Sequence, residues 1–178
     1  MNILIDKDKS ARLADFGLLT IVSEHTNFPT PTTASRGGTT RWMSPELLHS
    51  ELSDSGGGRP TRASDRYALG MVILEVLTGQ PPFALFKDLA VIQKVTDGGR
   101  PERPKGVKGA WFTDGLWEML GLCWKKDPQS RPSIEAVREC LEMTSSTWKP
   151  LPPQLTADAG EGEEDWDLSA LSVWITIF

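Results

Sequence analysis

The most regular pattern of apolar residues lies near the middle of the chain, in residues 64–78. Apolar side chains recur at helical spacing on both faces of this segment, namely Leu69, Val72, Ile73, Val76 and Leu77 on one face and Tyr67, Met71 and Leu74 on the other. A helix that is apolar all round is typical of the buried interior of a domain. Ser64 is a candidate cap at its start and Gly79 at its end. We therefore predict a buried central helix over residues 64–78.

Three weaker helical patterns follow the central helix. They occupy residues 86–96, 114–124 and 134–142, and each places its apolar side chains on a single stripe. Thr113 and Ser133 stand where an N-terminal cap is expected for the second and third of them. These segments predict a mainly helical domain that packs around the central helix.

The chain begins with a different pattern. Three apolar residues, 3–5, are followed by the polar turn 6–9 and then by apolar residues at 11, 13 and 14. This alternation around a polar turn predicts a small N-terminal β-hairpin. Residues 18–41 are rich in Thr, Pro, Ser and Gly, which predicts a long loop. The expected fold class is thus mainly α, with one small hairpin.

Composition places the chain among globular proteins and separates a tail from its body. Hydrophobic residues make up 39% and charged residues 24%, the balance of a folded domain of ordinary type. We assign residues 1–145 to the folded body. Residues 146–178 are interpreted as a disordered acidic tail with a short apolar end, because they contain the acidic run 161–167 and the apolar run 173–178.

Charge and cysteine usage restrict the class of partner. The net charge of −5 is the opposite of what a nucleic-acid surface requires, and no apolar run is long enough to cross a membrane. Cys123 and Cys140 form no C-x-x-C pair, and His25 and His49 have no neighbours at metal-ligand spacing. We therefore expect reduced cysteines, an intracellular and cytoplasmic protein, and neither nucleic acid nor membrane as a partner.

Five short motifs follow one another in a fixed order. They are Asn2-Ile3-Leu4, Asp15-Phe16-Gly17, Ser44-Pro45-Glu46, Asp65-Arg66-Tyr67-Ala68-Leu69-Gly70, and Cys123-Trp124 with Asp127-Pro128-Gln129-Ser130-Arg131-Pro132. In this order they resemble the C-terminal lobe of the eukaryotic protein kinase family, from the end of its catalytic loop through its D-F-G and A-P-E motifs to its late C-W-x-x-D-P-x-x-R-P signature. A single motif of this kind is weak evidence, whereas the ordered set is specific. The resemblance extends over residues 2 to about 143 and implies a kinase C-terminal lobe.

The resemblance implies a site for magnesium and ATP. In the family, the residues that match Asn2 and Asp15 hold Mg²⁺ through an amide oxygen and a carboxylate, which are the hard oxygen ligands that this ion prefers. Phe16 and Gly17 complete the cofactor-binding turn. Without the resemblance, Asp15 is a turn-forming residue before a glycine, and Asn2 is a terminal residue with no assigned role.

The resemblance also implies structural roles for three charged residues. Glu46 and Arg131 are expected to form a buried ion pair, since an arginine fork satisfies a carboxylate through two hydrogen bonds. Two unrelated surface charges are the alternative. Without the resemblance, Asp65 at the helix start is expected to be a cap; in the family its counterpart also hydrogen-bonds the backbone of the catalytic loop.

The segment 38–43, Gly-Thr-Thr-Arg-Trp-Met, indicates the substrate class. It is similar to the corresponding segment of serine/threonine kinases, and more narrowly of the tyrosine-kinase-like group, in which the residue matching Thr39 positions the catalytic Asp. The substrate implied is a serine or threonine of a protein. Hydroxyl residues between positions 26 and 40 are candidate phosphorylation sites or simply solvated loop residues, namely Thr26, Thr30, Thr32, Thr33, Ser35, Thr39 and Thr40.

The family's pattern is incomplete in these 178 residues. The catalytic Asp precedes the metal-binding Asn by five residues in the family, a position that would lie before Met1. The chain also contains no Gly-rich loop after a strand and no phosphate-binding lysine. We rank three interpretations: a fragment of a complete kinase, a degenerate binding or regulatory module, and a split kinase whose partner supplies the N-terminal lobe. In each case the isolated chain is predicted to be catalytically incompetent, with at most a metal-binding half-site.

Overall fold

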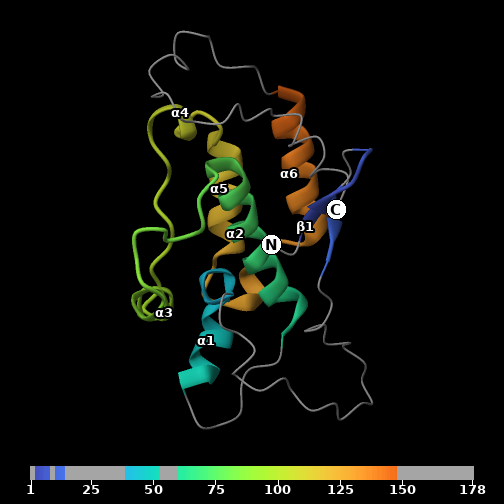
Figure 1. The fold of residues 1–178 in the computed structure, drawn as a ribbon. Coiled ribbons are helices and arrows are strands. Elements are labelled where there is room, and N and C mark those ends of the chain that lie inside the picture. The colour runs from blue at the N-terminus through green and yellow to red at the C-terminus, as the bar shows by residue number, and fades with distance from the viewer. Residues whose placement is uncertain (1–2, 9–10, 15–38, 53–59, 148–178) are drawn as a thin grey trace, which may run out of the picture.

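The computed structural model describes residues 3–8, 11–14, 39–52 and 60–147, and every structural statement below concerns these residues. Its elements, in chain order, are β1 (Ile3–Ile5), β2 (Ala11–Leu13), the 3₁₀ helix η3 (Thr40–Trp42), α1 (Pro45–Leu52), α2 (Arg62–Thr78), α3 (Asp88–Thr96), α4 (Gly106–Gly109), α5 (Asp114–Cys123), the 3₁₀ helix η4 (Pro128–Ser130) and α6 (Ile134–Thr147) (Figure 1). The two strands pair antiparallel with Ile3 opposite Leu13. The predicted fold class, mainly helical with a small N-terminal hairpin, is confirmed.

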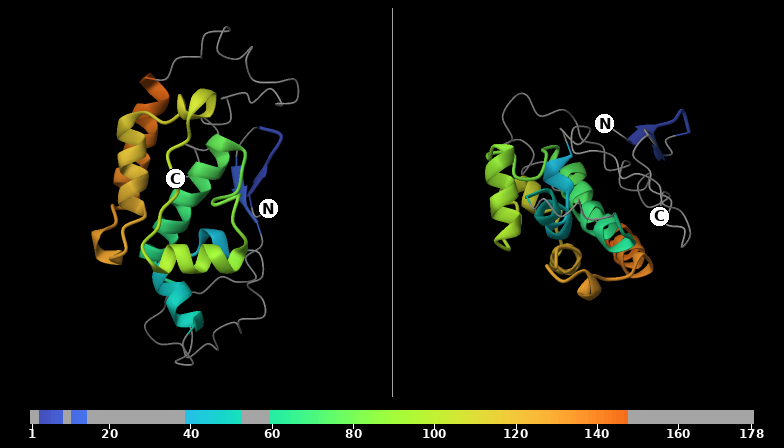
Figure 2. Two further views of the ribbon diagram at one scale, coloured as in Figure 1. Left: turned by 90° about the vertical axis from the view of Figure 1, so that its left-hand side faces the viewer. Right: turned by 90° about the horizontal axis from the view of Figure 1, so that it is seen from below.

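The helices pack around α2 and α5. Helix α5 contacts both α2 and α6, whereas α1 and η3 pack against α3 at the other end of the body. Figure 2 shows the hairpin at one edge of the molecule, beside the helices rather than among them. No helix within the described ranges is long and apolar enough to cross a membrane.

Helix α2 is the buried central helix that the apolar pattern predicts. Every residue from Arg66 to Thr78 is buried or half-buried. At its end Gly79 adopts a left-handed conformation, with φ 67°, and donates its N–H to the Glu75 carbonyl at 2.7 Å. Glycine is favoured here because a side chain would strain this backbone.

The start of α2 differs from the prediction. The helix begins at Arg62, and Thr61 rather than Ser64 is its cap. The Thr61 hydroxyl accepts the Ser64 backbone N–H at 3.1 Å, and the Ser64 hydroxyl accepts the Thr61 backbone N–H at 2.8 Å. Ser64 is therefore the second residue of a capping box, and it is the third residue of the helix.

The other helix boundaries agree with the sequence pattern to different degrees. Thr113 caps α5 as predicted, and its hydroxyl accepts the Leu116 N–H at 3.2 Å. Helix α3 begins two residues later than predicted, because a turn precedes it in which Phe86 donates to the Phe83 carbonyl at 2.9 Å. Helix α6 ends at Thr147 instead of residue 142, and the short α4 and the helix α1 were not predicted.

The core is built around the tryptophan of the Cys123-Trp124 motif. Trp124 is 1% exposed, and its ring meets that of Trp117 edge to face at 5.6 Å, as Trp117 in turn meets Phe112. Tyr67 and Met71 of α2 are fully buried in the same cluster. Two motifs from distant parts of the sequence thus share one core.

Gly70 is where α2 approaches this core most closely. A Cβ atom added to Gly70 would lie 2.7 Å from Nε1 of Trp124 and 3.0 Å from Cβ of Cys123. Glycine inside a helix ordinarily costs about 0.5–1 kcal/mol relative to alanine. We expect the reverse here: Gly70→Ala should lower the free energy of unfolding by about 1–3 kcal/mol through overpacking, measured by urea denaturation.

Gly121 provides the matched control for this prediction. It also lies inside a helix, α5, but a Cβ atom there would meet nothing within 4 Å. Gly121→Ala is therefore expected to stabilise the protein by about 0.5–1 kcal/mol. Equal effects of the two substitutions would mean that the contact between Gly70 and Trp124 does not constrain the helix.

Candidate functional site

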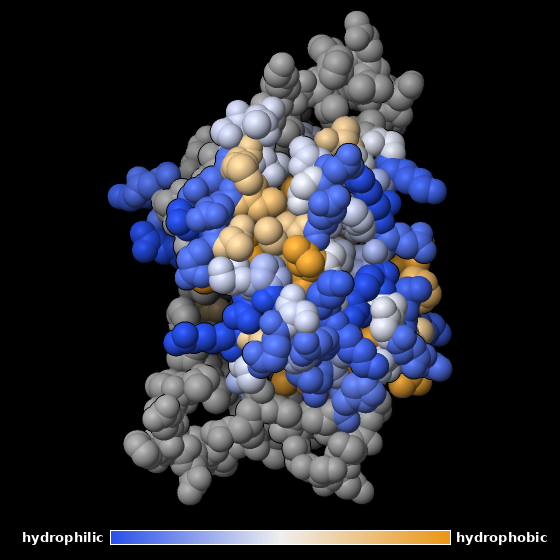
Figure 3. Space-filling view, turned by 180° about the vertical axis from the view of Figure 1, so that it is seen from behind, coloured by the Kyte–Doolittle hydropathy of each residue, from blue (hydrophilic) through white to orange (hydrophobic). Residues whose placement is uncertain are grey.

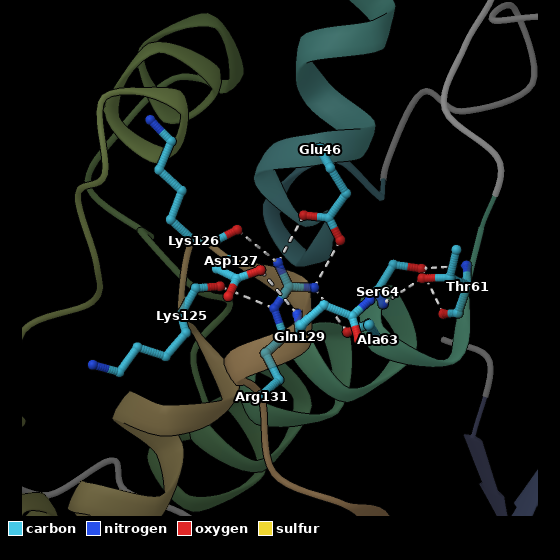
Figure 4. A network of polar contacts seen from close by, with 9 residues as sticks. All are labelled: Glu46, Thr61, Ala63, Ser64, Lys125, Lys126, Asp127, Gln129 and Arg131. Carbon is cyan, nitrogen blue, oxygen red and sulfur yellow. Dashed lines mark hydrogen bonds and ion pairs between the residues drawn. The ribbon is translucent and has the colours of Figure 1, made fainter.

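Three segments that are far apart in the sequence meet at the side chain of Arg131 (Figure 4). Glu46 comes from the first turn of α1, Ala63 from the first turn of α2, and Lys125 and Lys126 from the turn after α5. Arg131 itself directly follows η4. The arginine therefore joins the end of segment 39–46 to the two central helices.

The preceding turn fixes the backbone at Arg131. Asp127 caps η4: its Oδ1 accepts the Gln129 backbone N–H at 3.1 Å, and its Oδ2 accepts the Ser130 hydroxyl at 2.6 Å. These hydrogen bonds hold the pKa of Asp127 below its ordinary value. The Asp of the D-P-x-x-R-P motif thus shapes the turn from which the Arg of the same motif extends.

The guanidinium of Arg131 uses all of its N–H groups. Two parallel bonds of 2.7 Å run from Nη1 and Nη2 to Oε1 and Oε2 of Glu46. The remaining donors reach the carbonyls of Lys125 at 2.9 Å, Ala63 at 2.8 Å and Lys126 at 3.5 Å. The side chain is fully buried, and its guanidinium carbon lies 5.1 Å from the ring centre of Tyr67. The structure thus brings together Glu46 and Arg131, which are 85 residues apart.

The pairing changes the titration of Glu46. Burial by itself would raise the pKa of this carboxyl. The hydrogen bonds from Arg131, together with hydrogen bonds from its surroundings and the charge of Arg131, outweigh burial and lower the pKa below 4.5. A carboxylate whose pKa is lower in the folded than in the unfolded state stabilises the fold above its unfolded pKa. That contribution disappears as the pH falls through the folded pKa.

We therefore expect the ion pair to make stability depend on pH in the acid range. Its contribution should be complete above about pH 5 and should be lost progressively at lower pH. In urea denaturation at a series of pH values, Glu46→Gln should destabilise the protein strongly at pH 7 and progressively less as the pH falls below 4.5. A constant difference between the variant and the wild type from pH 3 to pH 7 would contradict this assignment.

Asp65 occupies a different position from the one predicted. It is the fourth residue of α2 and therefore not its cap, because the helix begins at Arg62. Burial raises the pKa of Asp65, and the charge of Arg66 opposes that shift only in part. Among the described residues no group donates a hydrogen bond to its carboxylate.

The segment 39–46 is anchored by two side chains. The Arg41 guanidinium donates to the carbonyls of Pro82 at 3.1 Å, Phe83 at 2.7 Å and Phe86 at 2.6 Å, and pairs with Asp88 at 2.9 Å. Trp42 Nε1 donates to Oε2 of Glu75, in the last turns of α2, at 2.9 Å. These contacts fix the segment against α2 and the start of α3.

The contacts of Arg41 and Trp42 were not predicted from the sequence, because no residue near them in the sequence indicates their partners. Thr39, the predicted positioning residue, is exposed at the start of η3, and its carbonyl accepts the Trp42 backbone N–H at 3.0 Å. Arg41 and Trp42 belong to segment 38–43, which resembles the corresponding segment of serine/threonine kinases. Their partners, however, lie about 30 to 45 residues further along the chain.

The predicted metal and cofactor residues Asn2, Asp15, Phe16 and Gly17 lie outside the described residues. The hairpin register pairs Ile3 with Leu13, so these two residues lie at the same end of the hairpin. An amide oxygen and a carboxylate brought to that end of the hairpin would suit Mg²⁺ chemically. Within the described ranges, no group of three or more His, Cys, Asp or Glu side chains could hold a metal ion.

Both cysteines lie in the buried part of the helical body. Cys123 and Cys140 are free thiols, and both are buried between α5 and its neighbours. Burial raises the pKa of Cys123 to about 12 and also raises the pKa of Cys140. Since the thiolate is the reactive form, neither cysteine is a nucleophile at neutral pH.

Comparison with known proteins agrees with this geometry. Residues 1–141 match the family model described as protein tyrosine and serine/threonine kinase. The chain is 29% identical over 167 residues to serine/threonine-protein kinase STY17 of Arabidopsis thaliana, which covers 93% of this chain and 24% of STY17. It is 28% identical over 151 residues to receptor-interacting serine/threonine-protein kinase 3 of Rattus norvegicus, covering 83% of this chain and 30% of the relative.

A third relative is also much longer than this chain. The probable serine/threonine-protein kinase drkD of Dictyostelium discoideum is 31% identical over 141 residues, which cover 79% of this chain and 10% of that protein. The chain thus spans less than a third of each of these relatives. The family match extends over most of the chain and includes the segments that meet at Arg131. The chain belongs to the protein tyrosine and serine/threonine kinase family.

Proposed function

We propose that this chain is the C-terminal lobe of a serine/threonine kinase, whose complete protein transfers the terminal phosphoryl group of ATP to serine or threonine residues of other proteins. The observation that supports this most directly is the ion pair of Glu46 with Arg131, which joins the end of segment 39–46 to the two central helices. That arrangement is what a kinase lobe needs in order to hold its substrate-facing segment in place. The relatives reported above are named as serine/threonine kinases.

The proposal assigns a role to each predicted site residue. Asn2 and Asp15 would hold Mg²⁺, which neutralises charge on the phosphate oxygens when it is bound with ATP. Phe16 and Gly17 would complete this turn. Thr39 would position the catalytic Asp, and Asp65, whose pKa burial raises, would accept hydrogen bonds from the backbone of the catalytic loop.

The isolated chain is proposed to be catalytically silent. Its 178 residues contain no Gly-rich loop motif after a predicted strand and no motif of the kind that carries the family's phosphate-binding lysine. Kinases act mainly by positioning their substrates and stabilising charge, so half a site retains little of the catalysis. Because ATP is the cofactor and both cysteines are free, we also propose an intracellular protein.

The test compares the 178-residue chain with the product of its complete gene. The 5′ end of the transcript is mapped and the codons before Met1 are read. An in-frame H-R-D-L-x-x-x sequence preceded by an N-terminal lobe supports the proposal, provided that the longer protein phosphorylates serine or threonine peptides while the short chain does not. An in-frame stop codon directly before Met1 would reject it in favour of a regulatory module, and robust transfer by the short chain would contradict its proposed silence.

A further inference from the structure

The helical body exposes a group of large apolar side chains at one place. This group, which we call the α3 surface, consists of Leu85, Phe86 and Leu89, whose side chains are 97%, 42% and 75% exposed. Leu122 of α5 and Met143 of α6 are also exposed, at 41% and 64%. In Figure 3, apolar side chains emerge among hydrophilic ones at the edge of the molecule where α3 lies and at the centre of the view. Contiguous apolar surface of this kind marks sites that other groups cover.

The α3 surface is held in a fixed shape. Arg41 binds three carbonyls of the loop that bears Leu85 and Phe86, and its ion pair with Asp88 fixes the start of α3. The Phe83 ring meets the Phe86 ring edge to face at 6.5 Å. The apolar side chains therefore project from an anchored loop, so a partner finds a preformed surface.

The free charges at the α3 surface are basic. Lys87 lies within the α3 surface, and the Lys94 ammonium lies 5.0 Å from the centre of the Phe86 ring. The only acidic residue between them, Asp88, is neutralised by Arg41. A segment that combines acidic and apolar residues therefore fits the α3 surface.

The chain itself contains such a segment. Residues 148–178 include six Asp and Glu and a single Lys, so they account for the whole net charge of −5. Within them, residues 161–171 alternate acidic residues with three large apolar ones, Trp166, Leu168 and Leu171. The 13 residues from 148 to 160 span up to about 45 Å when extended. That reach exceeds the diameter of roughly 40 Å expected for a body of this size.

We propose that residues 161–171 of the chain's own C-terminal tail dock on the α3 surface of the same molecule. Trp166, Leu168 and Leu171 cover Leu85, Phe86 and Leu89, and the acidic residues lie against Lys87 and Lys94. Because Arg41 joins this surface to segment 39–46, the docked tail stiffens the region that would face a protein substrate. The docking itself does not depend on the proposed phosphoryl transfer.

Zero-length crosslinking of the full chain tests the proposal. A carbodiimide joins lysine amines only to carboxylates that touch them, and mass spectrometry of the digested monomer identifies the pairs. We expect crosslinks from Lys87 and Lys94 to the acidic residues 161–167, and few from the exposed Lys105, Lys125 and Lys126. The double substitution Leu85→Ser/Leu89→Ser should reduce the expected crosslinks about tenfold, because it removes most of the apolar contact.

Two controls make the outcome decisive. The double substitution Leu122→Ser/Met143→Ser changes the two exposed apolar side chains of α5 and α6 and should leave the crosslinks unchanged. Circular dichroism shows whether either double variant keeps its helices. Mixing ¹⁵N-labelled with unlabelled chain shows whether crosslinked peptides come from one molecule. Crosslinks that join labelled to unlabelled peptides would overturn the proposal in favour of docking by a second copy. Crosslinks spread evenly over all exposed lysines would overturn it altogether.

Discussion

Replacing Arg131 with alanine is expected to lower the free energy of unfolding by about 3–5 kcal/mol. The substitution removes hydrogen bonds to Glu46 and to three backbone carbonyls, and it leaves the Glu46 carboxylate half-buried without its partner. Folded domains are stable by only about 5–15 kcal/mol, so the urea midpoint should fall to a fraction of its wild-type value. Arg131→Lys should recover little, because an ammonium cannot form the two parallel bonds.

The pair of Arg138 with Glu142 supplies the control. These residues are one turn apart on α6, their charged groups are 2.6 Å apart, and both side chains are about 40% exposed. Surface pairs at this spacing contribute only about 0.3–0.5 kcal/mol, so Arg138→Ala should move the midpoint little. If the two alanine substitutions had similar effects, Arg131 would not be the buried centre of the fold that its contacts indicate.

The parts of the fold that could be predicted are those with a local physical cause. An apolar pattern on all faces requires burial, and α2 is buried or half-buried from Arg66 to Thr78. Gly79 ends that helix because only glycine takes its left-handed conformation without strain. Thr113 caps α5 because a hydroxyl at this position accepts a backbone N–H that the helix leaves free.

The start of α2 and the end of α6 were predicted wrongly, because the residue types there allow more than one interpretation. Thr61 and Ser64 are both good caps by type, and only their reciprocal hydrogen bonds show which of them begins α2. The last turn of α6 consists of Thr and Ser residues, which disfavour a helical prediction. Thr144 nevertheless continues the helix, because it is buried and its hydroxyl donates to the Cys140 carbonyl at 2.8 Å.

The candidate site could be predicted only through the family resemblance. Nothing near Glu46 or Arg131 in the sequence indicates that they meet, because their partnership is created by three helices that converge. The contacts of Arg41 and Trp42 are of the same long-range kind and were not predicted. The proposed metal ligands Asn2 and Asp15 lie outside the described residues and remain a prediction that needs its own experiment.

The largest expected effect on activity is that of Asp15→Asn in the complete protein. If Asp15 is a ligand of Mg²⁺, the substitution removes a charged oxygen from the ion, and with it several kcal/mol of charge stabilisation in phosphoryl transfer. Transfer to serine or threonine peptides should then fall by about 10³-fold or more. In the isolated 178-residue chain the same substitution should change nothing measurable, because that chain is proposed to be silent.

The alternative role of Asp15, a turn-forming residue before Gly17, makes a different prediction. A turn-forming role would lower the urea midpoint and leave the dependence of the rate on Mg²⁺ concentration unchanged. A metal ligand gives the reverse: the midpoint stays near that of the wild type, while a much higher Mg²⁺ concentration is needed for any residual transfer. Asp8→Asn, in the exposed turn of the hairpin, controls for the loss of one nearby negative charge and should leave both measurements unchanged. Full activity of Asp15→Asn at ordinary Mg²⁺ concentration would remove Asp15 from the proposed site.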